Sequence, residues 1–276
     1  MSTFEELWEQ EHGDAPKFDA RAAMHQCWID TSKPLGPQPM LLSYGMDWEQ
    51  NPICVLGEGD ISVISGFAKT KKTFFKTMLI SSYISGDEMD PGKPFRTHRT
   101  GNEIILDIDT EQSAFHAQRA AKRVEYIAGK YEGYKPMGLK RYTAKERMAI
   151  IEAAVDTYKD RIGLICIDGF VDLAEDFNDQ VEAREISEKL MRWATDYKCH
   201  ITGVLHLNPG SNKMIGHIGS AIIRKVGTAF TVQKDDEDKN ASWVTHSLAR
   251  DMEIDRFKFE IINGIPKKAD EVSINF

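Results

Sequence analysis

Four short apolar segments, separated by segments of helical periodicity, constrain the fold of this chain more than any other feature. They cover residues 61–65, 103–109, 162–168 and 200–207. Strands that are buried on both faces read as nearly continuous apolar runs, and parallel strands need helical crossovers between them. The crossover helices are expected at 72–85, 112–130, 143–160 and 180–198. The pattern therefore predicts an α/β fold with a mostly parallel sheet flanked by helices.

Smaller elements complete this prediction. Short strands are expected at 41–44, 53–56 and 226–233, and the alternation at 242–262 predicts a C-terminal β-hairpin. The segments 86–102, 131–142 and 209–220 are expected to be loops, and the last of these is glycine-rich and expected to be mobile.

Charge is unevenly distributed along the 276 residues. The net charge is −8, and residues 1–60 hold eleven acidic and three basic side chains, so the rest of the chain is balanced. We expect residues 1–40 to form a small acidic N-terminal extension, with a short helix at 3–12 and an extended proline-rich connector at 33–39. The extension is expected either to be solvated or to dock on a basic surface of its own domain or of a neighbouring subunit.

Composition also bears on location. Cys27, Cys54, Cys166 and Cys199 show no CxxC spacing, which is typical of thiols in a reducing compartment. No apolar run approaches the roughly 20 residues of a membrane span. The N-terminus lacks the apolar core of a secretory signal. These features predict a cytoplasmic protein with no membrane partner.

A phosphate-binding loop is expected at residues 66–73, between a strand and a helix. The sequence Gly-Phe-Ala-Lys-Thr-Lys-Lys-Thr fits the pattern GxxxxGK[ST] at Gly66, Lys72 and Thr73. Such a loop directs backbone N–H groups and the positive end of the helix dipole at a phosphate. Lys72 would reach the β- and γ-phosphates, and Thr73 would offer its hydroxyl to Mg²⁺.

Lys71 departs from this pattern, which places glycine there. A residue with a Cβ resists the positive φ angles that glycine adopts freely. Lys71 also joins Lys69, Lys72 and Lys76 in a cluster of four positive charges. The departure leaves a basic surface turn that never meets a nucleotide as the alternative interpretation.

Polar side chains follow the other apolar segments at their carboxyl ends, which is the edge where parallel sheets bind ligands. Asp168 would hold Mg²⁺ opposite Thr73. Glu111, with Asp109 as a competitor, would activate a water molecule. His206 would sense the γ-phosphate. Each of these residues alone fits an ordinary turn or cap, and only their joint placement predicts a nucleotide site.

The order of these motifs is that of a known family. It runs from GxxxxxKT through DTEQ, ICIDG and VLHLN to a glycine-rich loop. This order resembles the RecA-fold P-loop ATPases, and among them the RepA/DnaB-type hexameric helicase branch. The lysine-rich stretch from Ala68 to Phe74 resembles, more narrowly, an ATPase family of mobile elements in Bacteroides-type bacteria. The resemblance covers about residues 40–262 and implies a RecA-like domain at 41–276.

The resemblance also implies which residues act. ATP with Mg²⁺ would be bound by Gly66, Ala68, Lys69, Thr70, Lys71, Lys72, Thr73 and Phe74, with Thr73 and Asp168 at the metal. The catalytic residues would be Glu111 as the base, Lys72, His206 as the sensor, and Arg250 as a finger for the neighbour's nucleotide. Arg250 lacks the flanking KxR pattern, so Arg224, Lys225 and Arg256 remain alternatives.

Three classes of function follow. The first is an ATPase that works as a homo-oligomer, a hexamer in the resembled branch, on single-stranded DNA in replication or mobilisation, with helicase or helicase-like activity. The second is a nucleotide-dependent switch with weak or no turnover because of Lys71. The third is a small-molecule kinase with a lid at 141–147.

DNA binding rests on the resemblance, because the charge pattern supports it only weakly. Arg119, Lys122 and Arg123 read as a solvated helix face, and 209–220 contains few cations. If the acidic extension shields a basic surface, deletion of residues 1–32 should raise DNA affinity at low salt.

Overall fold

The computed structural model describes residues 18–208, 214–250 and 252–269. The chain divides into two compact units, Met1–Pro37 and Gln38–Phe276. In the first unit, helix α2 (Ala20–Gln26) begins after Asp19, whose carboxylate accepts hydrogen bonds from the N–H groups of Arg21 and Ala22. The helix expected at 3–12 lies outside the described residues.

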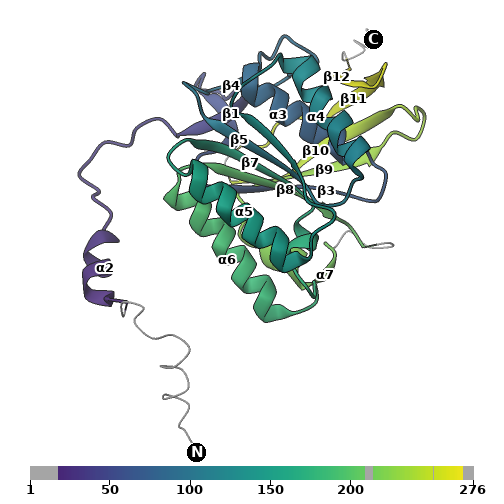
Figure 1. Cartoon of the computed structure of the whole chain (residues 1–276). Coiled ribbons are helices and arrows are strands. Elements are labelled where there is room, and N and C mark those ends of the chain that lie inside the picture. Colours follow the sequence, from purple (N-terminus) through teal and green to yellow (C-terminus); the bar gives the residue numbers. More distant parts are fainter. Residues whose placement is uncertain (1–17, 209–213, 251, 270–276) are drawn as a thin grey trace, which may run out of the picture. The chain divides into compact units, whose positions relative to one another are not determined.

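A nine-stranded sheet is the centre of the second unit (Figure 1). Its order is β12 (Ile265–Lys268), β11 (Phe257–Ile262), β10 (Ala241–Ala249), β9 (Thr228–Lys234), β3 (Ile61–Gly66), β8 (His200–His206), β7 (Ile162–Asp168), β5 (Ile104–Asp109) and β6 (Tyr134–Gly138). Neighbours from β9 to β6 are parallel, and those from β9 to β12 are antiparallel. The predicted α/β class, with a mostly parallel sheet and a C-terminal hairpin, is confirmed.

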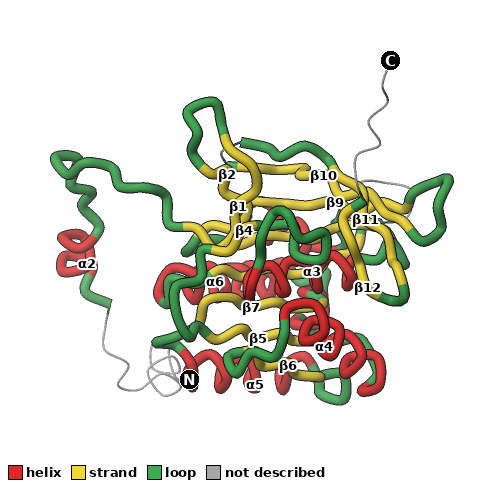
Figure 2. Tube along the Cα trace, turned by 90° about the horizontal axis from the view of Figure 1, so that it is seen from above, coloured by secondary structure: helices red, strands yellow, loops and turns green. Residues whose placement is uncertain are grey.

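Helices cover both faces of this sheet (Figures 1 and 2). Helices α3 (Lys72–Ser85) and α4 (Ala114–Ala128) pack together on one face. The other face carries α5 (Ala144–Tyr158), α6 (Gln180–Asp196), α7 (Gly216–Ile223) and the 3-10 turn η1 (Phe170–Leu173). Helix α5 begins with the predicted capping box, in which Thr143 and Glu146 bond each other's backbone N–H groups.

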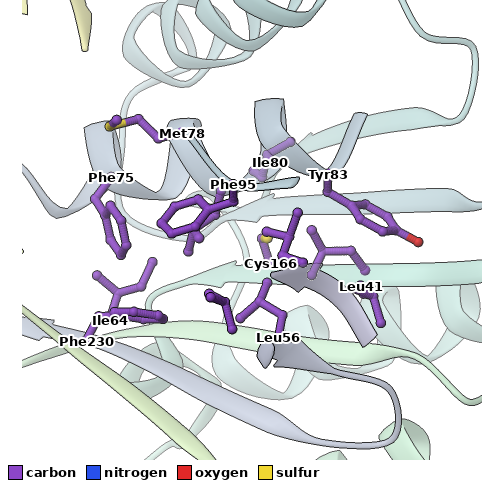
Figure 3. Close-up of a cluster of buried hydrophobic side chains, with 14 of the residues drawn as sticks. Leu41, Leu56, Ile64, Phe75, Met78, Ile80, Tyr83, Phe95, Cys166 and Phe230 are labelled. Atoms are coloured by element: carbon purple, nitrogen blue, oxygen red, sulfur yellow. The ribbon is translucent and has the colours of Figure 1, made fainter. Parts of the chain in front are cut away.

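Two apolar cores result, one on each face. Side chains alternate along the strands, so Ile64 of β3 enters one core and Val63 enters the other. Figure 3 shows part of the α3-side core, where Phe75 of α3 faces Phe230 of β9 with ring centroids 5.2 Å apart. Leu56 joins this core from a small antiparallel sheet made of β2 (Pro52–Gly57), β1 (Met40–Met46) and β4 (Arg96–Thr97).

All three expected loops were wrong in part. Residues 86–102 contain the two-residue strand β4. Residues 131–142 contain strand β6, whose Pro136 is tolerated because β6 is the last strand of the sheet. Residues 209–220 contain the start of α7, and residues 209–213 lie outside the described part. Gly219 lies where an added Cβ would be 2.8 Å from the Cβ of Met214, so this glycine serves close packing.

Candidate functional site

The predicted phosphate loop lies between the carboxyl end of β3 and the first turn of α3. Gly66 has φ +152°, and an added Cβ would lie 2.4 Å from the carbonyl oxygen of Val232 in β9. No side chain fits there without displacing backbone. Gly66 therefore lets the loop leave β3 against the neighbouring strand.

Lys71 adopts the left-handed conformation that the sequence suggested it would resist. Its φ and ψ are 70° and 28°, and Lys69 has φ 63°. The ammonium of Lys71 donates hydrogen bonds to the carbonyl oxygen of Ala241 (2.9 Å) and to the hydroxyl of Ser242 (3.3 Å), both in β10. The Lys71 side chain thus compensates for backbone strain with bonds to the sheet.

Lys72 is buried in the loop, with 5 % of its surface exposed. Its ammonium donates to the carbonyl oxygens of Gly66 (2.9 Å) and Phe67 (2.8 Å) and lies 3.2 Å from Nδ1 of His206. Burial lowers the pKa of Lys72 to about 8, and the charges of Asp168 and Glu111 oppose that shift.

Thr73 and Asp168 meet across the gap between α3 and β7. The Thr73 hydroxyl donates to Oδ2 of Asp168 at 3.0 Å. The same oxygen is 3.6 Å from the ammonium of Lys76, which pairs with Asp107 at 2.8 Å. Lys76, one of the four clustered lysines, therefore has its charge balanced within a buried ion pair.

Glu111 and His206 lie on the other side of Lys72 from the loop carbonyl groups and contact each other. Nε2 of His206 is 3.3 Å from Oε1 of Glu111. The two contacts are compatible when Nε2 of His206 carries a proton, because Nε2 then donates to Glu111 and Nδ1 accepts from Lys72. The hydrogen bond from His206 lowers the pKa of Glu111; burial opposes this shift, and the charge of Lys72 adds to it.

Asp109 has a different position from its competitor Glu111. Its Oδ1 accepts the backbone N–H groups of Glu111 (3.1 Å) and Gln112 (2.7 Å), and its carboxylate is 6 % exposed. Burial raises the pKa of Asp109, and the N–H of Gln112 opposes this shift. Asp109 thus shapes the turn that carries Glu111 and does not line the cavity described next.

One cavity of about 370 Å³ joins these groups. Of the loop residues predicted to bind nucleotide, its lining includes all except Gly66 and Ala68; Glu111, Asp168 and His206 also line it. This volume suits a small-molecule ligand, for which pockets of about 300–1,000 Å³ are usual.

Helix α4 adds two cations that the sequence analysis assigned to a solvated face. Arg119 and Arg123 line the cavity, whereas Lys122 is exposed. The guanidinium of Arg123 lies 4.0 Å from the centroid of the Phe74 ring, and its Nε donates to the carbonyl oxygen of Gly264 at 2.9 Å. Arg119 and Arg123 are four residues apart, a spacing that places both on one face of the helix and could have signalled that this face is turned to the site.

Thr110 and Arg147 support the carboxyl edge of the sheet, and neither role was apparent from the sequence. The Thr110 hydroxyl is 2.9 Å from the carbonyl oxygen of Asp168 and 2.6 Å from Oδ2 of Asp172, and it accepts the N–H of Gly169. Arg147, within the segment considered as a lid, donates to the carbonyl oxygens of Leu139 and Asp172. It therefore links the segment that follows β6 to the 3-10 turn η1.

The candidate finger Arg250 lies near the amino end of β3, whereas the phosphate loop of the same chain follows the carboxyl end of β3. It follows β10, whose last residues pair with the start of β9, and its guanidinium is 3.7 Å from Asp60, just before β3. Its side chain is 66 % exposed.

The alternative cations have other contacts. Arg256 stacks on Trp243 at 4.5 Å, and Arg224 and Lys225 line a separate cavity between α6 and α7.

These features define the class of protein: a P-loop nucleotide-binding protein with a RecA-like fold. More particularly, the chain belongs to the AAA domain family, which it matches over residues 49–212. It is also similar in structure to a KaiC-like protein of the hyperthermophilic archaeon Pyrococcus horikoshii OT3, with a TM-score of 0.58 and 15% identity. That likeness covers 85% of this chain and 100% of the other, and supports the fold.

No curated protein matches the chain significantly. In the described part of the chain, no helix has the length and apolarity that crossing a membrane requires.

Proposed function

We propose that this protein binds ATP in the cavity at the carboxyl edge of its sheet and hydrolyses it. One observation carries the proposal: two series of contacts border the same cavity. Thr73 meets Asp168 on one side, and Lys72, His206 and Glu111 are linked on the other. A phosphate-binding cation, a metal-binding hydroxyl and a base are the groups that hydrolysis of a nucleotide requires.

Lys72 and the N-terminus of α3 would bind the phosphates. The Lys72 ammonium, held by loop carbonyl oxygens in the free protein, would exchange these partners for phosphate oxygens. The negative charge of the phosphates would favour the protonated amine and raise the pKa of Lys72 above its free value of about 8. The helix dipole adds partial positive charge at the same place.

Thr73 and Asp168 fit Mg²⁺. They offer oxygen ligands 3.0 Å apart, and Mg²⁺ in such sites takes one or two protein ligands and completes its shell with water and phosphate. When bound, Mg²⁺ would neutralise charge on the phosphates.

Glu111 would orient a water molecule and accept its proton. Its lowered pKa keeps it ionised at neutral pH, and the Asp109 turn fixes its backbone. His206 bonds Glu111 with one ring nitrogen and Lys72 with the other. A shift of the Lys72 ammonium on nucleotide binding would therefore reach Glu111 through the ring of His206.

Arg119, Arg123 and Phe74 would contact the part of the nucleotide beyond the loop. Their guanidinium and aromatic groups suit either a nucleobase face or phosphate oxygens. Because they belong to the same chain as Lys72, this contact needs no neighbouring subunit.

The finer role is a homo-oligomeric, cytoplasmic ATPase that acts on single-stranded DNA in replication or mobilisation, with helicase or helicase-like activity. Support for it comes from the motif order and from Arg250, whose side chain is 66 % exposed and lies away from its own phosphate loop. To reach a neighbour's nucleotide, Arg250 would exchange its pair with Asp60 for phosphate oxygens. Membership of the mobile-element ATPase branch, which the stretch from Ala68 to Phe74 resembles, is part of the same proposal.

The experiment measures ATP hydrolysis by the full chain, with and without single-stranded DNA, together with particle mass. Lys72→Ala should abolish phosphate release, and Lys122→Ala, which removes an exposed lysine outside the cavity, should leave it unchanged. Undiminished hydrolysis by Lys72→Ala would refute the proposal. A hydrolysis rate that is the same with and without single-stranded DNA would refute the DNA role but not the proposed ATPase activity.

Two alternatives are separated from the ATPase by experiment. The switch with weak turnover assigns its loss of turnover to Lys71, which adopts the backbone conformation expected of glycine; no turnover by a wild-type protein that binds ATP would favour it. The kinase assigns a lid to 141–147, where Arg147 donates to the carbonyl oxygens of Leu139 and Asp172. Release of free phosphate, with no phosphorylated small molecule, would separate the ATPase from the kinase.

A further inference from the structure

Lys71 is the residue whose presence in the loop the proposed function does not explain. It stands where glycine is expected and adopts a left-handed backbone, which is strained for a residue with a Cβ. Its ammonium is bonded to β10. A lysine that served only to attract phosphate would not need partners in the sheet.

The contacts between the loop and β10 run in both directions. The Lys71 ammonium donates to the carbonyl oxygen of Ala241 and to the hydroxyl of Ser242. The hydroxyl of Ser242 lies 3.1 Å from the carbonyl oxygen of Thr70 and 2.8 Å from that of Ala241, and these two acceptors share its one proton. Ser242 is fully buried and Thr70 is 4 % exposed, so water competes little for these bonds.

We propose that Lys71 is a positioning residue that, with Ser242, ties the phosphate loop to strand β10 and holds the left-handed turn at the start of α3. The inference rests on the proposed function, because the loop that Lys71 positions is the one assigned to phosphate. In this role Lys71 does the work of the missing glycine by another means. Glycine would adopt the left-handed conformation without steric strain, whereas Lys71 offsets that strain with charge-assisted hydrogen bonds.

Charge around Lys71 fits this role. Burial and the nearby Lys234 lower the pKa of Lys71, and Asp238 and Asp235 oppose them. The two carboxylates belong to the turn between β9 and β10, so they favour a charged ammonium beside the strand that it bonds.

The first readout is amide hydrogen exchange of residues 66–74 in the nucleotide-free protein. Lys71→Gly keeps the backbone conformation accessible and removes the tie, and Lys69→Gly is the matched control. Lys69 is exposed, has the same left-handed backbone and carries the same charge. Lys71→Gly should speed exchange in the loop about fivefold more than Lys69→Gly, because a charge-assisted bond outweighs the relief of strain.

The second readout is nucleotide affinity. Lys71→Gly and Ser242→Ala should each raise the ATP dissociation constant. The double variant should have a higher dissociation constant than either single variant, but its fold increase should be smaller than the product of the two single increases. Lys71→Arg keeps donors in reach of β10 and should restore most of the affinity. Thermal melting of each variant shows whether the fold is retained.

The outcomes separate the possibilities. Loop exchange in Lys71→Gly equal to that in Lys69→Gly, with ATP affinity lost, would make Lys71 a phosphate ligand and overturn the proposal. ATP affinity and turnover equal to or above wild type in Lys71→Gly would also overturn it. If no variant, wild type included, binds ATP, the proposed function fails, while faster loop exchange would still support the tie.

Discussion

The buried ion pair between Lys76 and Asp107 offers the sharpest prediction on stability. The Lys76 ammonium lies 2.8 Å from Asp107 and 3.6 Å from Asp168, and the two partners of the closer pair have side chains 3% and 7% exposed. The second oxygen of Asp107 accepts the hydroxyl of Tyr134 at 2.6 Å. Burial alone would lower the pKa of Lys76, but Asp107 and Asp168 raise it, so Lys76 is charged at neutral pH.

Lys76→Met should therefore destabilise the protein strongly. Removing one partner of a buried pair leaves an uncompensated charge, here on Asp107, at a cost of about 3–5 kcal/mol. Stabilities of single domains are about 5–15 kcal/mol, so the loss is a large fraction of the total. For a domain of this size, it corresponds to a fall in Tm on the order of 10 °C.

The assay is thermal and urea unfolding followed by circular dichroism. Lys159→Met is the control, because Lys159 makes a pair of similar length (3.0 Å) with Asp156 on the surface and should change the unfolding curve little. The double variant Lys76→Met with Asp107→Leu should be no less stable than Lys76→Met alone, since both charges are gone. A Tm of Lys76→Met within about 2 °C of wild type would refute the reasoning.

Three further predictions concern the site. ATP binding should weaken as pH rises through about 8, by up to about tenfold per pH unit, because Lys72 in the free protein loses its proton there and phosphate binding requires the protonated amine. Calorimetry should show proton uptake on ATP binding mainly at pH 9 and little at pH 7, and an ATP affinity that does not change with pH would contradict this. Arg123→Ala should weaken ATP binding about tenfold by loss of a cavity cation, while Lys122→Ala should not, as fluorescence titration would show. Gly66→Ala should lower Tm by several degrees, because its methyl group would meet Val232.

The regular part of the fold was predictable because its physical cause is local. Strands 162–168 and 61–65 were placed within one residue because buried parallel strands are apolar throughout. Helix α3 was placed at its observed bounds, 72–85, because the phosphate-loop pattern marks its start and the glycine- and proline-rich segment from Gly86 marks its end. Strand β6 was missed because Pro136 reads as a loop signal, and only the position at the sheet edge makes it tolerable.

The site was predictable where spacing carries the chemistry. The joint position of Lys72, Thr73, Asp168, Glu111 and His206 followed from the rule that ligands bind at strand carboxyl ends, and the structure brings these residues around one cavity. Roles that depend on tertiary contacts could not be read from sequence.

Three residues show this limit. Lys76 reads as one more surface cation until β5 supplies Asp107. Arg123 reads as solvated until Phe74 and Gly264 hold it over the cavity. Lys71 reads as a defect until β10 gives its ammonium partners 170 residues away in the chain.

The central claim is that Glu111 activates water for a nucleotide held by Lys72, and one measurement tests it most directly. ATP binding and single-turnover phosphate release are followed in the same samples of wild type and Glu111→Gln. The glutamine keeps the size of the side chain but cannot accept the proton, so Glu111→Gln should bind ATP with near wild-type affinity and release phosphate at least about a hundredfold more slowly. Phosphate release at the wild-type rate from Glu111→Gln would contradict the account.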